Sequence, residues 1–173
     1  MTDSTVRSYT LRPMQADHLD RICRIEQASF SNPWPRESFL GDLRSSHARC
    51  TVALAGKLVI GYAIGWFVLD ELHVLNLAVD PENRRQGIGG RLLRDLLDAA
   101  AQKGCRYCAL ELRESNRQAR RLYQEYGFKP LAQRKKYYRH PTEDALVMWL
   151  DLQSRTRPGS SGPEVTDGVV SKS

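Results

Sequence analysis

The 173-residue sequence predicts a single α/β (α+β) domain built on a mixed, mostly antiparallel sheet of about seven strands with helices on both faces. An apolar fraction of 41% and a charged fraction of 27% are typical of a soluble globular domain. Strand-like runs alternate with single amphipathic helices, and short turns between strands indicate hairpins. We expect this domain to cover residues 8–153, between a flexible N-terminus (1–7) and a disordered Ser/Gly/Pro-rich tail (154–173).

The strands are predicted from short runs of apolar and β-branched residues. The run Leu72–Asp80 is apolar on both faces, which indicates a central strand. A turn at Gly56–Lys57 joins two of the other runs into a hairpin. In chain order, the seven predicted strands are Ser8–Met14, Cys50–Ala55, Leu58–Asp70, Leu72–Asp80, Tyr107–Arg113, Phe128–His140 and Asp144–Leu152.

Four helices are predicted from apolar residues three or four positions apart. The first two are Gln15–Phe30 and Arg36–Arg44. The fourth starts with Ser115 or Asn116 as its N-cap and ends at Gly127. The third follows a glycine cluster and has the strongest amphipathic pattern; its apolar face consists of Ile88, Leu92, Leu93, Leu96, Leu97, Ala100 and Ala101.

Composition excludes several classes of protein. The longest uncharged run, Leu58–Leu69, is too short to span a bilayer, and no basic start followed by an apolar run indicates a secretory signal. We therefore expect a cytoplasmic protein without membrane contact. Cys105 and Cys108 are spaced like half of a zinc site or a redox pair, but no second Cys/His pair matches them. Buried cysteines and no metal are the favoured interpretation.

The segment "RRQGIGG" combines two arginines with three glycines at a predicted helix start. A Walker loop is excluded because Arg91 follows Gly90 where a lysine is required. A dinucleotide fingerprint is disfavoured because Leu92 stands where its third glycine belongs. Exposed backbone N–H groups at a helix N-terminus instead predict an anion site suited to a pyrophosphate. The net charge of +6 also favours acidic partners.

The spacing Arg84-x-x-Gly87-x-Gly89 resembles the acetyl-CoA signature of the GNAT acyltransferase superfamily. "LNLAVDPENRRQGIG", "LELRESNRQARRLYQEYGF" and "YYRHPTEDALVMWLDL" are similar to its RimI-type branch, over about residues 8–152. "FSNPWPRESF" resembles the substrate loop of that branch, with Ser31–Asn32 inserted before Pro33. The resemblance implies the GNAT fold and acetyl transfer to the N-terminal alanine of a small-subunit ribosomal protein.

The resemblance also implies which residues bind acetyl-CoA, through a splayed central strand pair and the glycine loop. Asn76, a lone polar residue in its strand, is expected where the strand ladder opens. The predicted cofactor-binding residues are Leu77, Ala78, Val79, Arg84, Arg85, Gln86, Gly87, Ile88, Gly89, Gly90 and Asn116.

Glu111 is the strongest candidate for chemistry because it interrupts the apolar strand "ALEL". One interpretation is a core glutamate paired with Arg113 or Arg117. The other is a general base, whose pKa an apolar site would raise towards neutrality. The resemblance implies the second role, and it implies that Tyr123 is the general acid.

The segment "RKKYYRH" mixes basic and aromatic side chains, as nucleic-acid-binding surfaces do. The resemblance instead favours a peptide groove in which Trp34, Tyr137 and Tyr138 contact the acceptor. Two alternatives stay open: a GNAT enzyme acting on lysine or a small-molecule amine, and a non-catalytic ribosome- or RNA-binding module that uses Arg134–Arg139. We expect a monomer whose acceptor is a protein N-terminus, with no direct need for nucleic acid.

Overall fold

The computed structural model describes residues 8–154; the predicted flexible N-terminus and nearly all of the predicted tail lie outside this range. Within it, seven strands form one sheet in the order β1-β2-β3-β4-β5-β7-β6. The strands are β1 (Thr10–Pro13), β2 (Ala48–Ala55), β3 (Leu58–Val68), β4 (Glu71–Val79), β5 (Tyr107–Arg113), β6 (Lys129–Arg139) and β7 (Thr142–Asp151).

The sheet is mixed and mostly antiparallel, as predicted. β1 to β4 form an antiparallel series, β4 and β5 are parallel, and β7 pairs antiparallel with both β5 and β6. The parallel step requires a crossover, which the third helix supplies. β4 is therefore the fourth of seven strands, and its predicted central place is confirmed.

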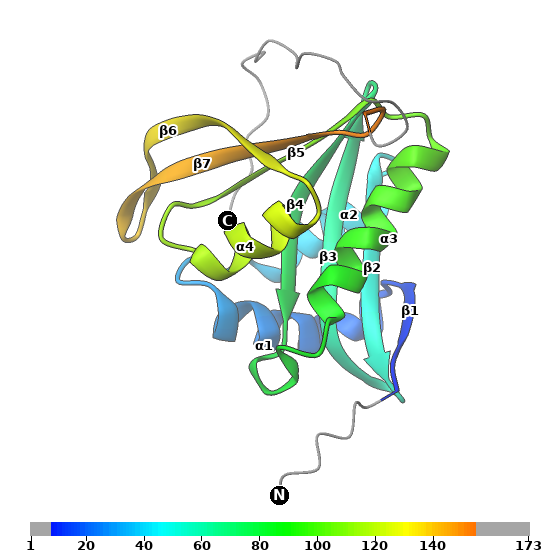
Figure 1. Cartoon of the computed structure of the whole chain (residues 1–173). Helices are drawn as coiled ribbons and strands as arrows, with labels where there is room; N and C mark the ends of the chain where they lie inside the picture. The colour runs from blue at the N-terminus through cyan, green and yellow to red at the C-terminus, as the bar shows by residue number, and fades with distance from the viewer. Residues whose placement is uncertain (1–7, 155–173) are drawn as a thin grey trace, which may run out of the picture.

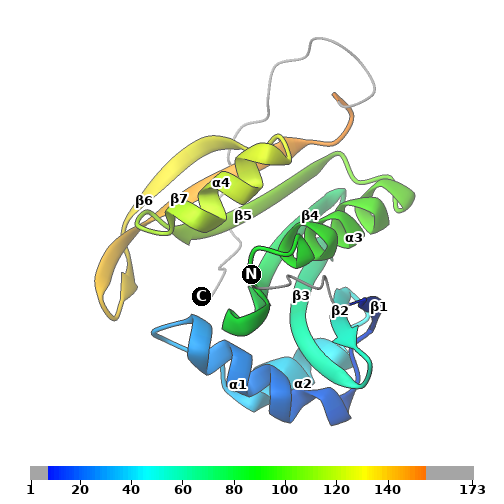
Figure 2. The same ribbon diagram turned by 60° about the horizontal axis from the view of Figure 1, so that its bottom comes forward.

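Two helices cover each face of the sheet, and alternate side chains of the strands point to opposite faces (Figures 1 and 2). In β3, Tyr62 and Ile64 pack towards α1 and α2, whereas Ala63 packs towards α3. The two resulting cores are largely aliphatic, and Cys105 and Cys108 are buried in the α3 core. The helices are α1 (Leu19–Ser29), α2 (Arg36–Arg44), α3 (Ile88–Gln102) and α4 (Arg117–Glu125).

The helix ends follow the expected local chemistry. The Asn116 side chain accepts a hydrogen bond from the Ala119 N–H at 3.1 Å, so Asn116 rather than Ser115 caps α4. Gly127 ends that helix with a φ of +92°. The first helix differs from expectation, because Ala16–His18 form a 3-10 turn before α1 begins. Among the described residues, no helix is long and apolar enough to cross a membrane.

Candidate functional site

The sheet opens at its centre, between β4 and β5. These strands pair only from Glu71 to Val74 on β4, opposite Tyr107–Leu110 on β5. Beyond Val74 they diverge (Figure 1). On its other side β4 carries a bulge, since Ile64 pairs with Asn76 but Gly65 pairs with Val74. The ladder therefore opens beside Asn76, as predicted, and leaves the backbone groups of the following residues on that side outside the ladder.

A small cavity, with a volume of about 70 Å³, lies where β4 and β5 begin to diverge. Its walls come from β4, β5, α4, β6 and the segment after α1. We call it the acceptor cavity. The lining residues are Phe30, Val74, Leu75, Asn76, Leu77, Glu111, Leu112, Arg113, Asn116, Ala119, Tyr123 and Tyr138. The predicted catalytic pair, Glu111 and Tyr123, thus lines one cavity together with Tyr138.

The Glu111 side chain is 6% exposed. Its Oε1 lies 3.1 Å from Nη1 of Arg134. Its Oε2 is buried and has no hydrogen-bond partner within the described part of the chain. The Tyr137 hydroxyl also lies close to this carboxylate, and the interaction contributes to the raised pKa of Tyr137. The ionic partner is therefore Arg134, not Arg113 or Arg117 as the core interpretation assumed. A buried carboxylate oxygen left without a donor is costly unless a ligand supplies one, so this atom is suited to accept a proton or hydrogen bond.

Two tyrosines beside Glu111 differ in position. Tyr123 is 8% exposed, and burial raises the pKa of its phenol. It therefore stays protonated at neutral pH, as a proton donor must. Tyr138 lines the cavity and stacks under the Arg113 guanidinium, whose Cζ lies 4.3 Å from the ring centroid. The Tyr137 ring is edge-on to Tyr138 but is not part of the cavity wall.

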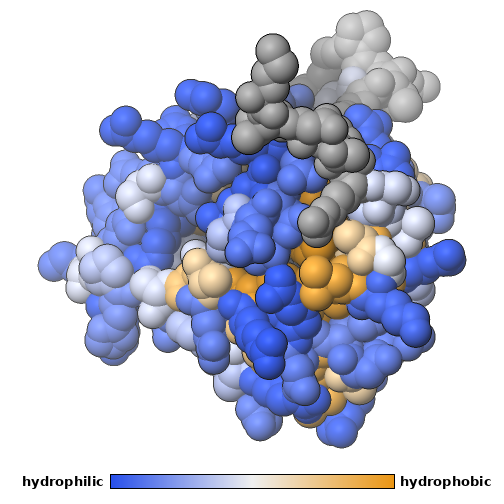
Figure 3. All heavy atoms as spheres, turned by 90° about the horizontal axis from the view of Figure 1, so that it is seen from below, coloured by the Kyte–Doolittle hydropathy of each residue, from blue (hydrophilic) through white to orange (hydrophobic). Residues whose placement is uncertain are grey.

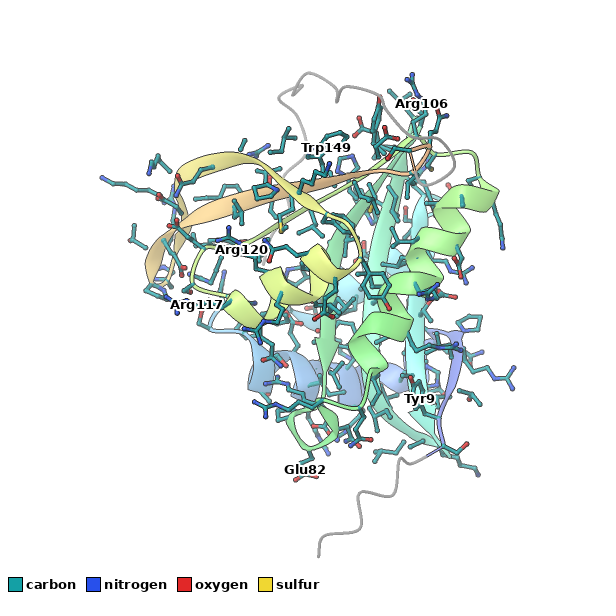
Figure 4. All side chains as sticks on the ribbon, viewed as in Figure 1. Tyr9, Glu82, Arg106, Arg117, Arg120 and Trp149 are labelled. Atoms are coloured by element: carbon teal, nitrogen blue, oxygen red, sulfur yellow. The ribbon has the colours of Figure 1, made fainter. Side chains whose placement is uncertain are left out.

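A larger groove of about 800 Å³ adjoins the acceptor cavity and shares four wall residues with it. We call it the cofactor groove. The shared residues are Phe30, Leu77, Asn116 and Ala119. Every predicted cofactor-binding residue except Gln86 lines this groove. The loop between β4 and α3, which carries Glu82, lies at the end of the molecule towards which β4 runs (Figure 4).

The start of α3 explains the glycine cluster. Gly87 is the N-cap of α3 with a φ of +75°, and Arg85 is also left-handed at +61°. Only glycine adopts the first conformation without strain. Because intrahelical hydrogen bonds start at the Arg91 N–H, the first N–H groups of α3 are available at the groove. Position 90 requires glycine for a different reason, because a Cβ there would lie 2.7 Å from the Tyr126 hydroxyl.

The groove is positively charged as well as rich in donors. Arg85, Arg117 and Arg121 all line it, and Figure 4 shows Arg117 on α4. Arg84, which also lines the groove, links the end of β4 to the end of α1. Its Nε donates to the Val79 carbonyl at 3.0 Å, and its Nη2 donates to Ser29 Oγ at 3.1 Å. A helix N-terminus flanked by arginines suits a pyrophosphate and a further phosphate.

Some residues that line the two cavities were not found from the sequence. Phe30 lines both cavities, but an aromatic residue at the end of an amphipathic helix gives no signal of this. Arg117 and Arg121 lie one helical turn apart, which places them on one face of α4 and was a usable sign. Trp34, predicted to contact the acceptor, lies outside both cavity walls, and its ring is 5.6 Å from Phe39.

Viewed from the end towards which β4 runs, the surface is mostly hydrophilic with apolar atoms across its middle (Figure 3). Among the described residues, no group of three or more His, Cys, Asp or Glu side chains is placed to hold a metal ion.

Comparison with known proteins agrees with this geometry. Residues 19–128 match the acetyltransferase (GNAT) family. The chain is 39% identical to the N-alpha-acetyltransferase RimI of Mycobacterium tuberculosis over 137 residues. This alignment covers 76% of this chain and 85% of that protein.

Solved structures give the same result. The crystal structure of the ribosomal-protein-S18-alanine N-acetyltransferase from Escherichia coli has a TM-score of 0.78 and 29% identity, covering 92% of this chain and 99% of that one. Arabidopsis thaliana NAA60 in complex with acetyl-CoA shares the fold, with a TM-score of 0.77 at 17% identity, over 83% of this chain and 98% of that one. The resemblance expected from the glycine motif is confirmed, and the chain belongs to the GNAT family of acetyl-CoA-dependent N-acetyltransferases.

Proposed function

We propose that this enzyme transfers the acetyl group of acetyl-CoA to the α-amine of a protein N-terminus, and that its acceptor is the N-terminal alanine of ribosomal protein S18. The observation that carries the chemistry is the buried Oε2 of Glu111, which accepts no hydrogen bond within the described residues. The acceptor follows from the activity named for the Escherichia coli relative.

The proposed reaction is direct attack in a ternary complex. The pyrophosphate of acetyl-CoA binds the N–H groups at the start of α3, and the pantetheine arm runs along Leu77–Val79 towards the acceptor cavity. The amine nitrogen attacks the thioester carbonyl while Glu111 takes the proton that the nitrogen loses, directly or through water. A backbone N–H of β4 stabilises the oxyanion. As the C–S bond breaks, Tyr123 protonates the leaving thiolate.

Proton arithmetic supports an α-amine over a lysine. An α-amino group has an ordinary pKa of about 7.7–8.0, against about 10.4 for lysine. At pH 7.5 about a third of N-terminal amines are neutral, but only about one lysine in a thousand. A lysine-directed site must supply roughly 3.4 kcal/mol more to deprotonate its amine. Among the described residues, Glu111 is the only carboxylate in the wall of the acceptor cavity.

The size of the acceptor cavity supports a small first residue. At about 70 Å³ this cavity is far smaller than the cofactor groove of about 800 Å³, which favours a small first side chain over an aromatic one. We expect Tyr138, in the cavity wall, to contact the first peptide bonds, and we retain Trp34 and Tyr137 as predicted substrate contacts. A ribosomal acceptor would place the reaction in the cytoplasm, and we expect a monomer to carry it out.

Two synthetic peptides with internal lysines test this proposal: one begins with a free alanine, and the other is identical but N-formylated. Each is incubated with acetyl-CoA, and the added acetyl group is located by fragmentation in a mass spectrometer. We expect acetylation only at the free α-amine. A third peptide that begins with tryptophan should react more slowly. Efficient acetylation of a lysine in the formylated peptide would refute the N-terminal assignment and support a lysine acetyltransferase.

A further inference from the structure

Glu26 is a buried acid that the proposed reaction does not use. It lies on α1 and is 1% exposed. No salt bridge to it is present among the described residues. Burial raises the pKa of this carboxyl group. Burying a carboxyl group destabilises the fold unless hydrogen bonds replace those it made with water.

Three donors from three elements converge on this side chain. Glu26 Oε1 accepts the backbone N–H of Trp34 at 2.8 Å. Glu26 Oε2 accepts the amide of Asn76 at 3.0 Å and also the hydroxyl of Tyr62. Asn76 and Tyr62 are themselves 97% or more buried. The carboxyl group thus joins β3, β4 and the segment between α1 and α2.

One of these partners lines the reaction site, and a second lies in a segment that reaches it. Asn76 lines the acceptor cavity and adjoins the bulge where the sheet opens. Trp34 belongs to the segment 30–35, which we call the acceptor loop. Phe30, at the start of the acceptor loop, forms a wall of both cavities. The hydroxyl of Ser31 reaches across the opening and donates to the His140 carbonyl, in the β6–β7 turn, at 2.9 Å.

We propose that Glu26 is a positioning residue for the acceptor substrate, because it fixes the acceptor loop and the Asn76 amide, and both Phe30 of that loop and Asn76 line the acceptor cavity. This inference rests on the proposed function. Glu26 does not touch the substrate. It holds one end of the acceptor loop through Trp34, while Ser31 holds the other end against the β6–β7 turn.

The chemistry of the carboxyl group makes this role testable by a nearly isosteric change. A carboxylate has two oxygens that accept all three donors, whereas glutamine has one accepting oxygen and an NH₂ group. If the glutamine oxygen accepts from Tyr62 and Asn76, its NH₂ group faces the Trp34 N–H, two donors meet, and the acceptor loop is released. If the glutamine oxygen accepts from the Trp34 N–H instead, its NH₂ group faces the Asn76 amide, and the Asn76 side chain must turn. Either outcome disturbs the acceptor side of the site and leaves the start of α3 unchanged.

The experiment compares steady-state kinetics of wild-type enzyme, Glu26→Gln and the control Asp42→Asn, with the free alanine peptide as acceptor. Asp42 is a matched control because it is a buried acid on neighbouring α2, and neither it nor its partner, Trp66 Nε1, lines either cavity. We expect Glu26→Gln to raise the KM for peptide tenfold or more and the KM for acetyl-CoA less than twofold. Asp42→Asn should leave both values within twofold of wild type.

Thermal melts separate positioning from folding. An unchanged peptide KM in Glu26→Gln, with or without a lower Tm, would overturn the proposal, as would an equal rise in both KM values. If Glu26→Gln does not fold, the exposed Ser31→Ala variant decides: we expect a peptide KM raised severalfold at unchanged Tm, and no rise would refute the role of the acceptor loop. Wild-type turnover of the peptide tests the proposed function separately.

Discussion

Gly89 provides a sharp test of the cofactor groove, because a side chain fits there without damaging the fold. A Cβ at Gly89 would lie 3.5 Å from Leu122 and 3.7 Å from both Leu77 and Val79, which are ordinary contacts. Valine at this position adds two further methyl groups to a groove wall formed by those residues. It is expected to keep the anion from one or two of the N–H groups at the start of α3.

A hydrogen bond to a charged group contributes about 1.5–3 kcal/mol, so the loss of one weakens binding by about 10-fold to 150-fold. Isothermal titration of Gly89→Val with acetyl-CoA, and with CoA, measures this change. Gly41→Val is the control: it makes the same substitution in α2, where a Cβ would meet nothing within 4 Å. We expect control affinity equal to wild type. Unchanged affinity in folded Gly89→Val would refute the anion site at the start of α3.

Three further predictions follow from other parts of the structure. Tyr123→Phe should lower kcat about 10–100-fold at unchanged Tm, less than the largest general-acid effects because a thiolate leaves readily; an unchanged kcat would remove Tyr123 from the reaction. Burial raises the pKa of Asp42 above its ordinary 3.8, so the stability contributed by its proton is present below that pH and is lost as pH rises through the folded pKa. The Tm of Asp42→Asn relative to wild type should therefore increase from pH 4 to pH 7, and a constant difference would contradict this. Gly90→Ala should destabilise by about 1–3 kcal/mol in denaturant titrations because of its 2.7 Å approach to the Tyr126 hydroxyl, and Tyr126→Phe in the same chain should recover part of the loss.

Local patterns predicted much of this fold because local chemistry determines them. Helix α2 and strand β5 have the predicted bounds, and Asn116 caps α4 as its short polar side chain suggested. The opening of the sheet at Asn76 was also predictable, since a lone amide in an apolar central strand requires a special environment. The glycine loop was recognised because three glycines stand within four positions, 87–90, directly before an amphipathic helix.

Features that depend on distant segments could not be predicted. Arg134 reaches Glu111 because β7 lies between β5 and β6, and this strand order is not visible in any local pattern. Glu26 resembles a solvent-facing residue of an amphipathic helix until Tyr62 and Asn76 are brought against it. Trp34 was expected in the acceptor groove, but the apolar contact with Phe39 determines where its ring packs.

The turnover of Glu111→Gln tests the central claim most directly. The variant keeps the size of the side chain, retains an oxygen that can accept from Arg134, and removes the ability to take a proton. With saturating acetyl-CoA and the free alanine peptide, we expect kcat to fall about 10²–10⁴-fold while the Kd for acetyl-CoA changes less than twofold. Wild-type kcat in this variant from pH 6 to pH 9 would contradict the assignment of Glu111 as the base and, with it, the proposed reaction.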